Sequence, residues 1–238
     1  MIANASSLGD ITTLVFDVMG TVVDDDGPIR RVATEVLTRA AVEPALVPQL
    51  VQDWLDRHAE LLAEVVSGAD WSSHDDLRAA ALDDVWAAAG LRELPATTRD
   101  ELTGVIHRLD PWPDSPAALT ALRSHYTVVA LSNADVAELT GLSAYGGLSW
   151  HCALSGQLAH AYKPQPAVYR LALDLLGVDP ARILMVAAHP WDLRAAAEHG
   201  MRTAFVDRPG STAPASDDTF DLEVDDLAGL VTELTRTA

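Results

Sequence analysis

The stretch ITTLVFDVMGTVVD, residues 11–24, decides how the rest of the chain is organised. Its apolar, β-branched start is typical of a fully buried strand, which ends at the carboxylate of Asp17 and is broken at Gly20 and Thr21. In an open α/β sheet, ligands bind at the carboxyl ends of the strands. Asp17 is therefore a candidate functional acid, although an acid at the end of a strand can also serve only to cap a turn.

Length and composition are those of a globular protein. The chain has 238 residues, 49% of them apolar, which suits one large domain or a core with one sizeable insertion. The single cysteine, Cys152, has no partner for an internal disulfide, and we expect a small buried residue there instead of a nucleophile. No run is long enough to cross a bilayer and residues 1–10 lack the features of a signal peptide, so we expect a cytoplasmic protein.

The charge of the chain limits its partners. A formal net charge of −19, from 16 basic and 35 acidic residues, disfavours nucleic acid and anionic membranes. A small anionic substrate would also be repelled, so local donors and cations must hold it. Lys163 is the only lysine among those basic residues, and all the others are arginine. Chance alone can produce this, but a lone lysine also suggests a position that needs a compact ammonium group.

The segment after the first strand is helical. Residues 29–108 show no convincing strand, and helical spacing recurs over residues 29–40, 46–68, 74–90 and 98–109. A helical segment of this length between two strands predicts an inserted cap domain. The prolines of LDPWPDSP, residues 109–116, stop the last helix and mark the return to the core. We predict a core over residues 1–24 and 111–238 and a helical cap over residues 25–110.

The remainder of the chain alternates between helix and strand. Strand patterns cover residues 127–131, 151–154, 182–187 and 202–206, and helical patterns cover residues 115–125, 135–144, 166–176 and 190–199. A short strand and a closing helix follow within residues 220–234. This alternation predicts an α/β fold whose parallel sheet is joined by right-handed crossovers.

Polar side chains follow four of the predicted strands or the loops after them. Because parallel strands share one carboxyl edge, these side chains are expected to face a single crevice under the cap. They are Asp17 and Thr21, Ser132 and Asn133, Lys163, and His189 with Asp192.

Three of these residues have local neighbours that bear on their roles. Asp192 falls in the first turn of a helix opened by Pro190, where any acid is favoured by the backbone N–H groups. Lys163 precedes Pro164, which favours an extended backbone, and beside carboxylates it would stay charged. His189 is expected at the sheet edge and not in the core.

Four segments, in order, resemble the motifs of the haloacid dehalogenase superfamily, and most closely those of the L-2-haloacid dehalogenases. They are FDVMGTVVD (16–24), LSN (131–133), YKPQPAVYRLAL (162–173) and VAAHPWDLRAAAEHG (186–200). The resemblance implies a Rossmann-like core, a helical cap inserted after the first strand, and Asp17 as the nucleophile. It also suggests a homodimer.

Two positions depart from the phosphatases of that superfamily. Met19 stands where they carry the second acid of DxD, and Ala188 stands where they carry a metal-binding acid. Only Asp17 and Asp192 would remain as carboxylate ligands for Mg²⁺. We therefore expect chemistry at carbon, with no metal and no cofactor.

The resemblance implies a two-step reaction on a short 2-haloacid. Asp17 attacks C2 in line and expels halide, and water then hydrolyses the aspartyl ester to give the 2-hydroxy acid with inverted configuration. Asp192, with His189, is expected to orient or deprotonate this water. Lys163 is expected to keep Asp17 ionised and to stabilise negative charge on its carboxyl group.

The same resemblance implies a set of substrate-binding residues. Thr21 and Ser132 are expected to bind the substrate carboxylate, and Met19 is also expected to be a substrate-binding residue. Asn133 resembles the asparagine that contacts the halide, and Tyr169 the tyrosine that supports the lysine or the substrate.

Two mismatches concern the leaving group. The dehalogenases usually carry a halide-binding arginine directly after a cap tryptophan, but Trp54 is followed by Leu55. Arg57 is a candidate substitute even though it lies about 200° further around a helix, and Arg30 and Arg31 are others. His189 and Ala187 also replace an asparagine and a serine. This pattern resembles a branch with defluorinating dehalogenases and a cis-epoxysuccinate hydrolase.

Three alternatives to a haloacid dehalogenase therefore stay open at this point. They are an epoxide hydrolase of the cis-epoxysuccinate type, a Mg²⁺-dependent phosphatase or phosphonatase, and a degenerate binding protein without activity. The cap tryptophans Trp54, Trp71 and Trp86 are expected to be core residues, and the remaining histidines show no metal-ligand spacing.

Overall fold

The computed structural model describes residues 8–91 and 93–236 and contains a six-stranded parallel sheet with the strand order β3-β2-β1-β4-β5-β6. Its strands are β1 (Thr13–Phe16), β2 (Thr127–Ser132), β3 (Cys152–Ser155), β4 (Ile183–Ala187), β5 (Arg202–Val206) and β6 (Leu222–Val224). β1 is central, and Phe16 pairs with Ala130 of β2 and Val186 of β4. The predicted α/β fold with a parallel sheet is confirmed.

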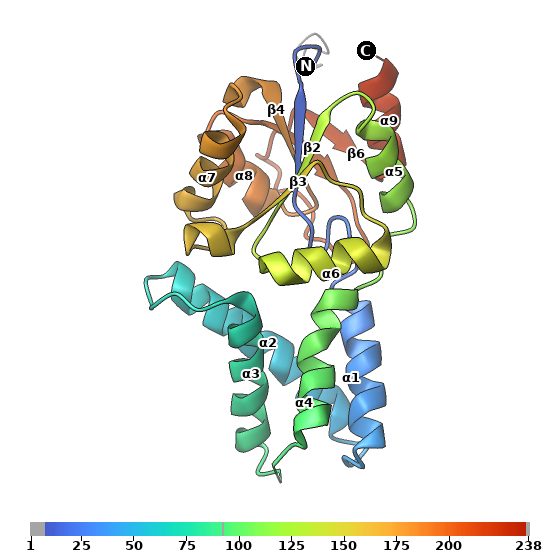
Figure 1. Ribbon diagram of the computed structural model, residues 1–238, viewed down its shortest axis with the longest axis vertical. Helices are drawn as coiled ribbons and strands as arrows, with labels where there is room; N and C mark the ends of the chain where they lie inside the picture. The colour runs from blue at the N-terminus through green and yellow to red at the C-terminus, as the bar shows by residue number, and fades with distance from the viewer. Residues whose placement is uncertain (1–7, 92, 237–238) are drawn as a thin grey trace.

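Helices cover both faces of the sheet (Figure 1). They are α5 (Ser115–Leu122), α6 (Val136–Gly146), α7 (Pro166–Leu176), α8 (Pro190–Glu198) and α9 (Leu227–Arg236), with short 3₁₀ helices at Gly156–Ala159 and Pro180–Arg182. Successive residues of β1 face opposite sides. Leu14 and Phe16 belong to the hydrophobic cluster that includes α5, α6 and α9, and Val15 to the one that includes α7 and α8.

A lobe of helices is inserted between β1 and α5 and lies at the carboxyl ends of the strands (Figure 1). It consists of α1 (Gly27–Arg39), α2 (Val47–Val66), α3 (His74–Ala88) and α4 (Ala96–Thr103). The predicted helix over residues 98–109 is divided, because α4 ends before Gly104 and a 3₁₀ helix follows over Gly104–Arg108. Glycine has a low helix propensity, which accounts for the change. The boundaries at residues 24/25 and 110/111 stay a prediction.

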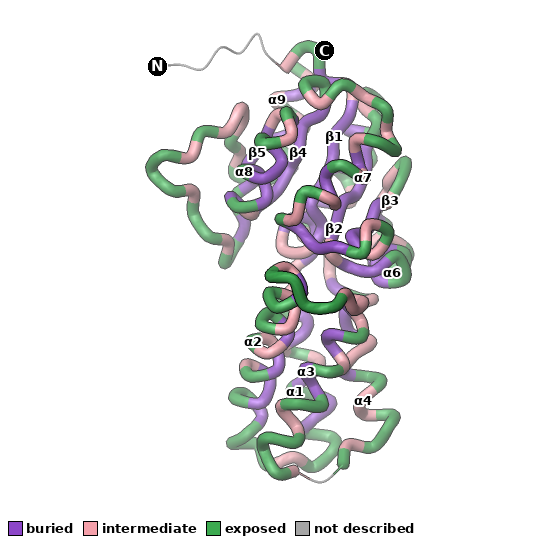
Figure 2. Tube along the Cα trace, turned by 90° about the vertical axis from the view of Figure 1, so that its left-hand side faces the viewer, coloured by how far each residue is buried: buried purple, intermediate pink, exposed green. Residues whose placement is uncertain are grey.

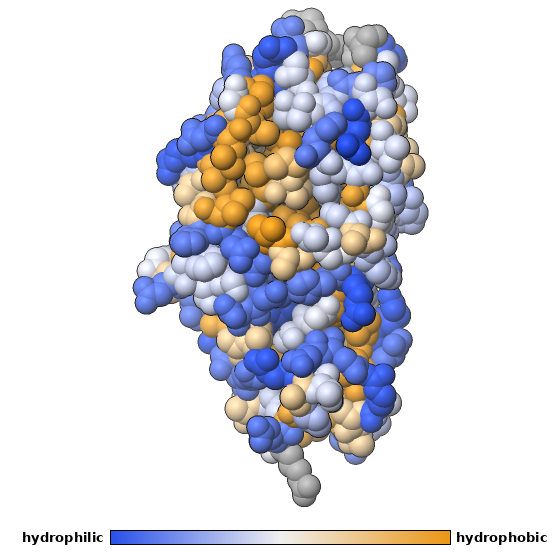
Figure 3. Space-filling model, viewed as in Figure 1, coloured by the Kyte–Doolittle hydropathy of each residue, from blue (hydrophilic) through white to orange (hydrophobic). Residues whose placement is uncertain are grey.

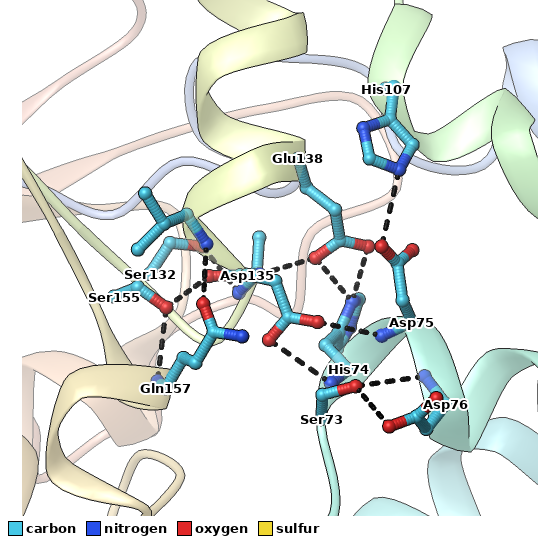
Figure 4. A network of polar contacts seen from close by, with 12 residues as sticks. Ser73, His74, Asp75, Asp76, His107, Ser132, Asp135, Glu138, Ser155 and Gln157 are labelled. Atoms are coloured by element: carbon cyan, nitrogen blue, oxygen red, sulfur yellow. Dashed lines mark hydrogen bonds and ion pairs between the residues drawn. The ribbon is translucent and has the colours of Figure 1, made fainter.

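The lobe is joined to the sheet layer by a polar network between the N-termini of α3 and α6 (Figure 4). The carboxylate of Asp135 accepts the backbone N–H groups of His74 and Asp75 at 3.2 and 3.0 Å. Glu138, which is fully buried, lies 2.8 Å from Nδ1 of His74. Asp135, the N-cap residue of α6, therefore satisfies N–H groups that the first turn of α3 leaves free, and Glu138 holds the ring of His74.

Burial is concentrated in the strands, whereas the outer surfaces of the lobe are exposed (Figure 2). The prediction that Cys152 is buried was wrong: it is an exposed free cysteine at the start of the edge strand β3. No helix within the described ranges is both long and apolar enough to cross a membrane.

Candidate active site

Asp17 follows β1 directly and is held by groups from the ends of neighbouring strands. Its backbone N–H continues the sheet by donating to the carbonyl of Val186 at 3.0 Å, and the residue is 6% exposed. The hydroxyl of Thr21 donates to Oδ2 of Asp17 at 2.6 Å and accepts the N–H of Ala188 at 2.9 Å. Thr21 therefore ties the turn after β1 to the end of β4.

The turn between Asp17 and Thr21 depends on Gly20, whose φ is +73°. A Cβ atom added there would lie 3.0 Å from Cε1 of His189. The glycine supplies the left-handed backbone and leaves room for the histidine ring.

Lys163 lies between two carboxylates. Its Nζ donates to Oδ1 of Asp17 at 3.0 Å and to Oδ2 of Asp192 at 2.7 Å, and the residue is 2% exposed. The hydroxyl of Tyr169 donates to Oδ1 of Asp192 at 2.6 Å, and Oδ1 of Asn133 accepts the backbone N–H of Lys163 at 2.7 Å. The residues predicted from four separate loops are thus brought together.

His189 is the N-cap residue of α8 and faces Asp17 from the end of β4. Its Nδ1 lies 2.9 Å from Oδ2 of Asp17, and 30% of its side chain is exposed. Each oxygen of Asp17 consequently has a different environment: Thr21 and His189 contact Oδ2, and Lys163 contacts Oδ1.

These contacts set the protonation of the buried pair. Burial by itself would raise the pKa of Asp17, but the charge of Lys163 and the hydrogen bond with His189 outweigh it and hold that pKa below its ordinary value. Burial would lower the pKa of Lys163, and the charges of Asp17 and Asp192 raise it above the ordinary value instead. Asp17 is therefore a carboxylate, and Lys163 an ammonium, near neutral pH.

The other two ionisable groups respond to the same charges. Burial raises the pKa of Asp192, with Lys163 opposing and Asp17 adding to the shift. Burial would lower the pKa of His189, but its hydrogen bond to Asp17 and the charge of that residue raise the pKa above 6.5. The protonation of His189 therefore depends on the charge of Asp17.

A cavity of about 590 Å³ lies between the sheet edge and the lobe. The predicted site residues that line it are Asp17, Met19, Ser132, Asn133, Lys163 and His189. Thr21, Tyr169 and Asp192 are buried behind this wall and support residues that line it. The hydroxyl of Ser132 accepts the backbone N–H of Ala134 at 3.2 Å.

Arg57 lies apart from the cavity. Its guanidinium pairs with Asp84 at 2.9 Å, with Glu60 at 3.1 Å and with Glu64 at 3.2 Å. These ion pairs occupy the surface of the lobe, as its position about 200° around α2 from the cavity-lining Leu55 suggests.

The other two candidate arginines of the lobe are also paired elsewhere. Arg30 contacts Asp26 and Gln52, and Arg31 contacts Asp110. Of the residues that the structure describes, none of these arginines lines the cavity.

One arginine that the sequence reasoning missed does line it. Arg78 of α3 is 3% exposed, and its Cζ lies 5.9 Å from the centroid of the Trp54 ring. In the part of the chain that the structure describes, its Nε and Nη1 have no hydrogen-bond partner. Asp75 and Asp76 precede Arg78 closely and give the start of α3 the pattern of an exposed helix. The sequence therefore holds no signal that Arg78 is buried in a cavity wall.

A family model described as a haloacid dehalogenase-like hydrolase matches residues 11–200. The chain belongs to the haloacid dehalogenase-like hydrolases.

Two curated relatives within this family match over most of their length. (S)-2-haloacid dehalogenase 4A of Burkholderia cepacia is 30% identical over 202 residues, which is 83% of each chain. (S)-2-haloacid dehalogenase 1 of Pseudomonas sp. (strain CBS-3) is 29% identical over 202 residues, or 83% of this chain and 85% of the relative.

Solved structures of haloacid dehalogenases share the whole fold. An L-2-haloacid dehalogenase superposes with a TM-score of 0.85 at 33% identity, covering 95% of this chain and 99% of that one. A defluorinating L-2-haloacid dehalogenase superposes with a TM-score of 0.87 at 30% identity, covering 94% and 95%.

The acids of this haloacid dehalogenase-like hydrolase are not grouped as metal ligands. Among the described residues, no three His, Cys, Asp or Glu side chains are placed to hold one ion. Met19 lines the cavity beside Asp17, and Ala188 is buried behind it. The expectation of a metal-free reaction stays a prediction.

Proposed function

We propose that the protein is a metal-independent (S)-2-haloacid dehalogenase that converts a short 2-haloacid into the 2-hydroxy acid with inversion. The observation that carries this proposal is a buried, ionised Asp17 that faces the cavity with Lys163 and His189 and has the apolar Met19 in place of a second acid. The names of the relatives support the same reaction.

The first step is attack of Asp17 on C2, which forms a C–O bond while the carbon–halogen bond breaks and its electron pair leaves with the halide. A carboxylate offers about four lone-pair sites, two on each oxygen. Oδ2 already accepts from Thr21 and His189, whereas Oδ1 accepts, among the described residues, from Lys163 alone. We therefore assign Oδ1 as the attacking atom.

The second step is hydrolysis of the ester at Cγ of Asp17. Ester formation removes the negative charge of Asp17, and the hydrogen bond and charge of Asp17 are the largest of the causes that raise the pKa of His189. His189 then loses a proton to solvent, and its Nδ1, which lies 2.9 Å from Oδ2 before the reaction, accepts a proton from a water beside Cγ. The hydroxyl of that water bonds to Cγ and the bond between Cγ and Oδ1 breaks. The alkoxide of the product takes the proton of the new carboxyl group, so that Asp17 returns as a carboxylate and His189 keeps the proton it took from water.

The supporting residues have separate tasks in this proposal. The hydroxyl of Thr21 stabilises negative charge on Oδ2 during hydrolysis. Asp192 holds the ammonium of Lys163 through Oδ2, and Tyr169 holds Asp192 by donating to Oδ1, so both oxygens of this fully buried carboxylate are occupied. Ser132 and Asn133 line the cavity and are left to contact the substrate.

The substrate of this reaction is a small anion, as expected for the partner of a haloacid dehalogenase. We also propose a homodimer. Figure 3 shows apolar surface gathered over the region of α7 and β3, and Leu158 and Leu175 in and beside that region are 52% and 60% exposed. Such a patch favours contact with another protein surface. A cytoplasmic location stays a prediction.

Halide release in EDTA tests the proposed reaction. We expect release from (S)-2-chloropropionate and bromoacetate that EDTA does not reduce, together with the inverted hydroxy acid, and no release by the matched variant Asp17→Asn. Diol from cis-epoxysuccinate without halide release from any haloacid would contradict the dehalogenase proposal, and so would phosphate release that requires Mg²⁺.

A further inference from the structure

The guanidinium of Arg78 is a buried cation with unused donors. It is 3% exposed, and its Nε and Nη1 lack a hydrogen-bond partner within the described chain. Burying a charged donor without an acceptor is costly, so such a group in a cavity wall points to a bound anion. Arg78 lines the cavity that Asp17 also lines.

A second unused polar atom belongs to the same wall. Nε2 of His58, on α2, has no partner among the described residues, and His58 is 8% exposed and lines the cavity. Burial and the nearby charge of Arg78 hold the pKa of His58 well below 6.5, so the ring is neutral near pH 7. A neutral ring with its proton on Nε2 adds an uncharged donor next to the cation.

Arg78 is held in position by Trp54 and by the anchored start of α3. Its guanidinium lies over the Trp54 ring, and the indole N–H of Trp54 donates to the carbonyl of Arg78 at 3.0 Å. Four residues earlier on the same face of α3, His74 is held by Glu138 in the network between the lobe and the sheet layer (Figure 4). The donor is therefore held in place before any ligand binds.

The direction of the substitution at C2 indicates which anion Arg78 would bind. Asp17 approaches C2 from the sheet edge, and an in-line displacement expels the leaving group on the opposite side of the carbon. Arg78 and His58 come from the lobe, which forms that opposite side of the cavity. Leu55, which stands at the position of the family's halide-binding arginine, also lines this wall but carries no charge.

We propose that Arg78, assisted by His58, binds the halide as it leaves C2 and stabilises the charge that develops on it. This assignment rests on the proposed dehalogenase function. Because the charge on the halogen grows in the transition state, the contact acts mainly on kcat.

Chloride-35 NMR line broadening tests the anion site without any turnover, with sodium chloride as the probe. We expect the wild-type protein to broaden the chloride line, Arg78→Gln to lose that excess broadening, and Arg78→Lys to retain part of it. Arg99→Gln is the matched control, since Arg99 is a lobe arginine paired with Asp83. Circular dichroism and urea unfolding establish that each variant is folded. Equal broadening by folded Arg78→Gln and wild type would overturn the proposal.

Steady-state kinetics on (S)-2-chloropropionate tests the role in catalysis. We expect Arg78→Gln to lower kcat about 100-fold or more, with a smaller change in KM and partial rescue by Arg78→Lys. An unchanged kcat with a raised KM would overturn the leaving-group role. If wild type releases no halide from any haloacid while the Arg78-dependent broadening persists, the proposed function fails and the anion site stands.

Discussion

The ammonium of Lys163 donates to Oδ1 of Asp17 at 3.0 Å, although the two residues are 146 positions apart in the chain. The pair is buried, and the second carboxylate that Lys163 contacts, on Asp192, is buried with it. Removing the cation would leave two buried carboxylates facing each other, so the first prediction concerns Lys163.

We expect Lys163→Met to lose about 3–5 kcal/mol of unfolding free energy near neutral pH, because one partner of a buried ion pair is left without compensation. Urea unfolding at pH 7 measures the loss. The deficit should shrink as pH falls, because the freed carboxylates of Asp17 and Asp192 are then protonated. A deficit that does not depend on pH would contradict this electrostatic account.

The rate of the first step should be insensitive to acid over a wide range. Since the pKa of Asp17 lies below its ordinary value, its carboxylate stays ionised, and the halide burst should keep its rate from pH 8 down to about pH 5. Rapid-quench measurement of released halide checks this. In Lys163→Met the main opposing charge to burial is gone, so an acid limb should appear at higher pH.

His189 should control the second step more than the first. We expect His189→Ala to accumulate the ester on Asp17, because the residue that accepts the proton of water is absent while Lys163 still holds Oδ1. Intact-protein mass spectrometry after mixing with bromoacetate would show the added mass. Loss of the halide burst itself, with no ester, would instead place His189 in the first step.

The network between α3 and α6 should stabilise the joint between the lobe and the sheet layer. We expect Glu138→Gln to lower the unfolding free energy by about 1–3 kcal/mol, because the buried His74 loses its charged acceptor. Glu60→Gln, whose side chain is 65% exposed, is the control and should stay within about 0.5 kcal/mol of wild type. Similar losses in both variants, measured by urea unfolding, would argue against a special role for this contact.

The strands and their polar exits could be predicted because each depends on a local pattern. Apolar runs that end in Asp17, Ser132 or the AAHP segment identify buried parallel strands, and the common carboxyl edge then brings the exits together. The division of the predicted helix at Gly104 and the exposure of Cys152 depend on packing and on strand order, which the periodicity does not contain.

The lobe side of the cavity was harder to predict for the same reason. Arg78 and His58 lie on helices of the lobe, where charged and polar residues normally face solvent, and only the packing of α3 against α2 shows that these two face inward. Arg57 shows the converse, because its surface ion pairs depend on acids that come from two helices.

A single turnover in H₂¹⁸O, with enzyme in excess over (S)-2-chloropropionate, tests most directly whether Asp17 is the nucleophile. The aspartyl-ester route places ¹⁸O in the carboxylate of Asp17 and leaves the new hydroxyl of the product unlabelled. Mass spectrometry of the peptide that contains Asp17 and of the hydroxy acid gives both quantities. Label in the product with none in Asp17 would show that water attacks C2 directly and would contradict the mechanism.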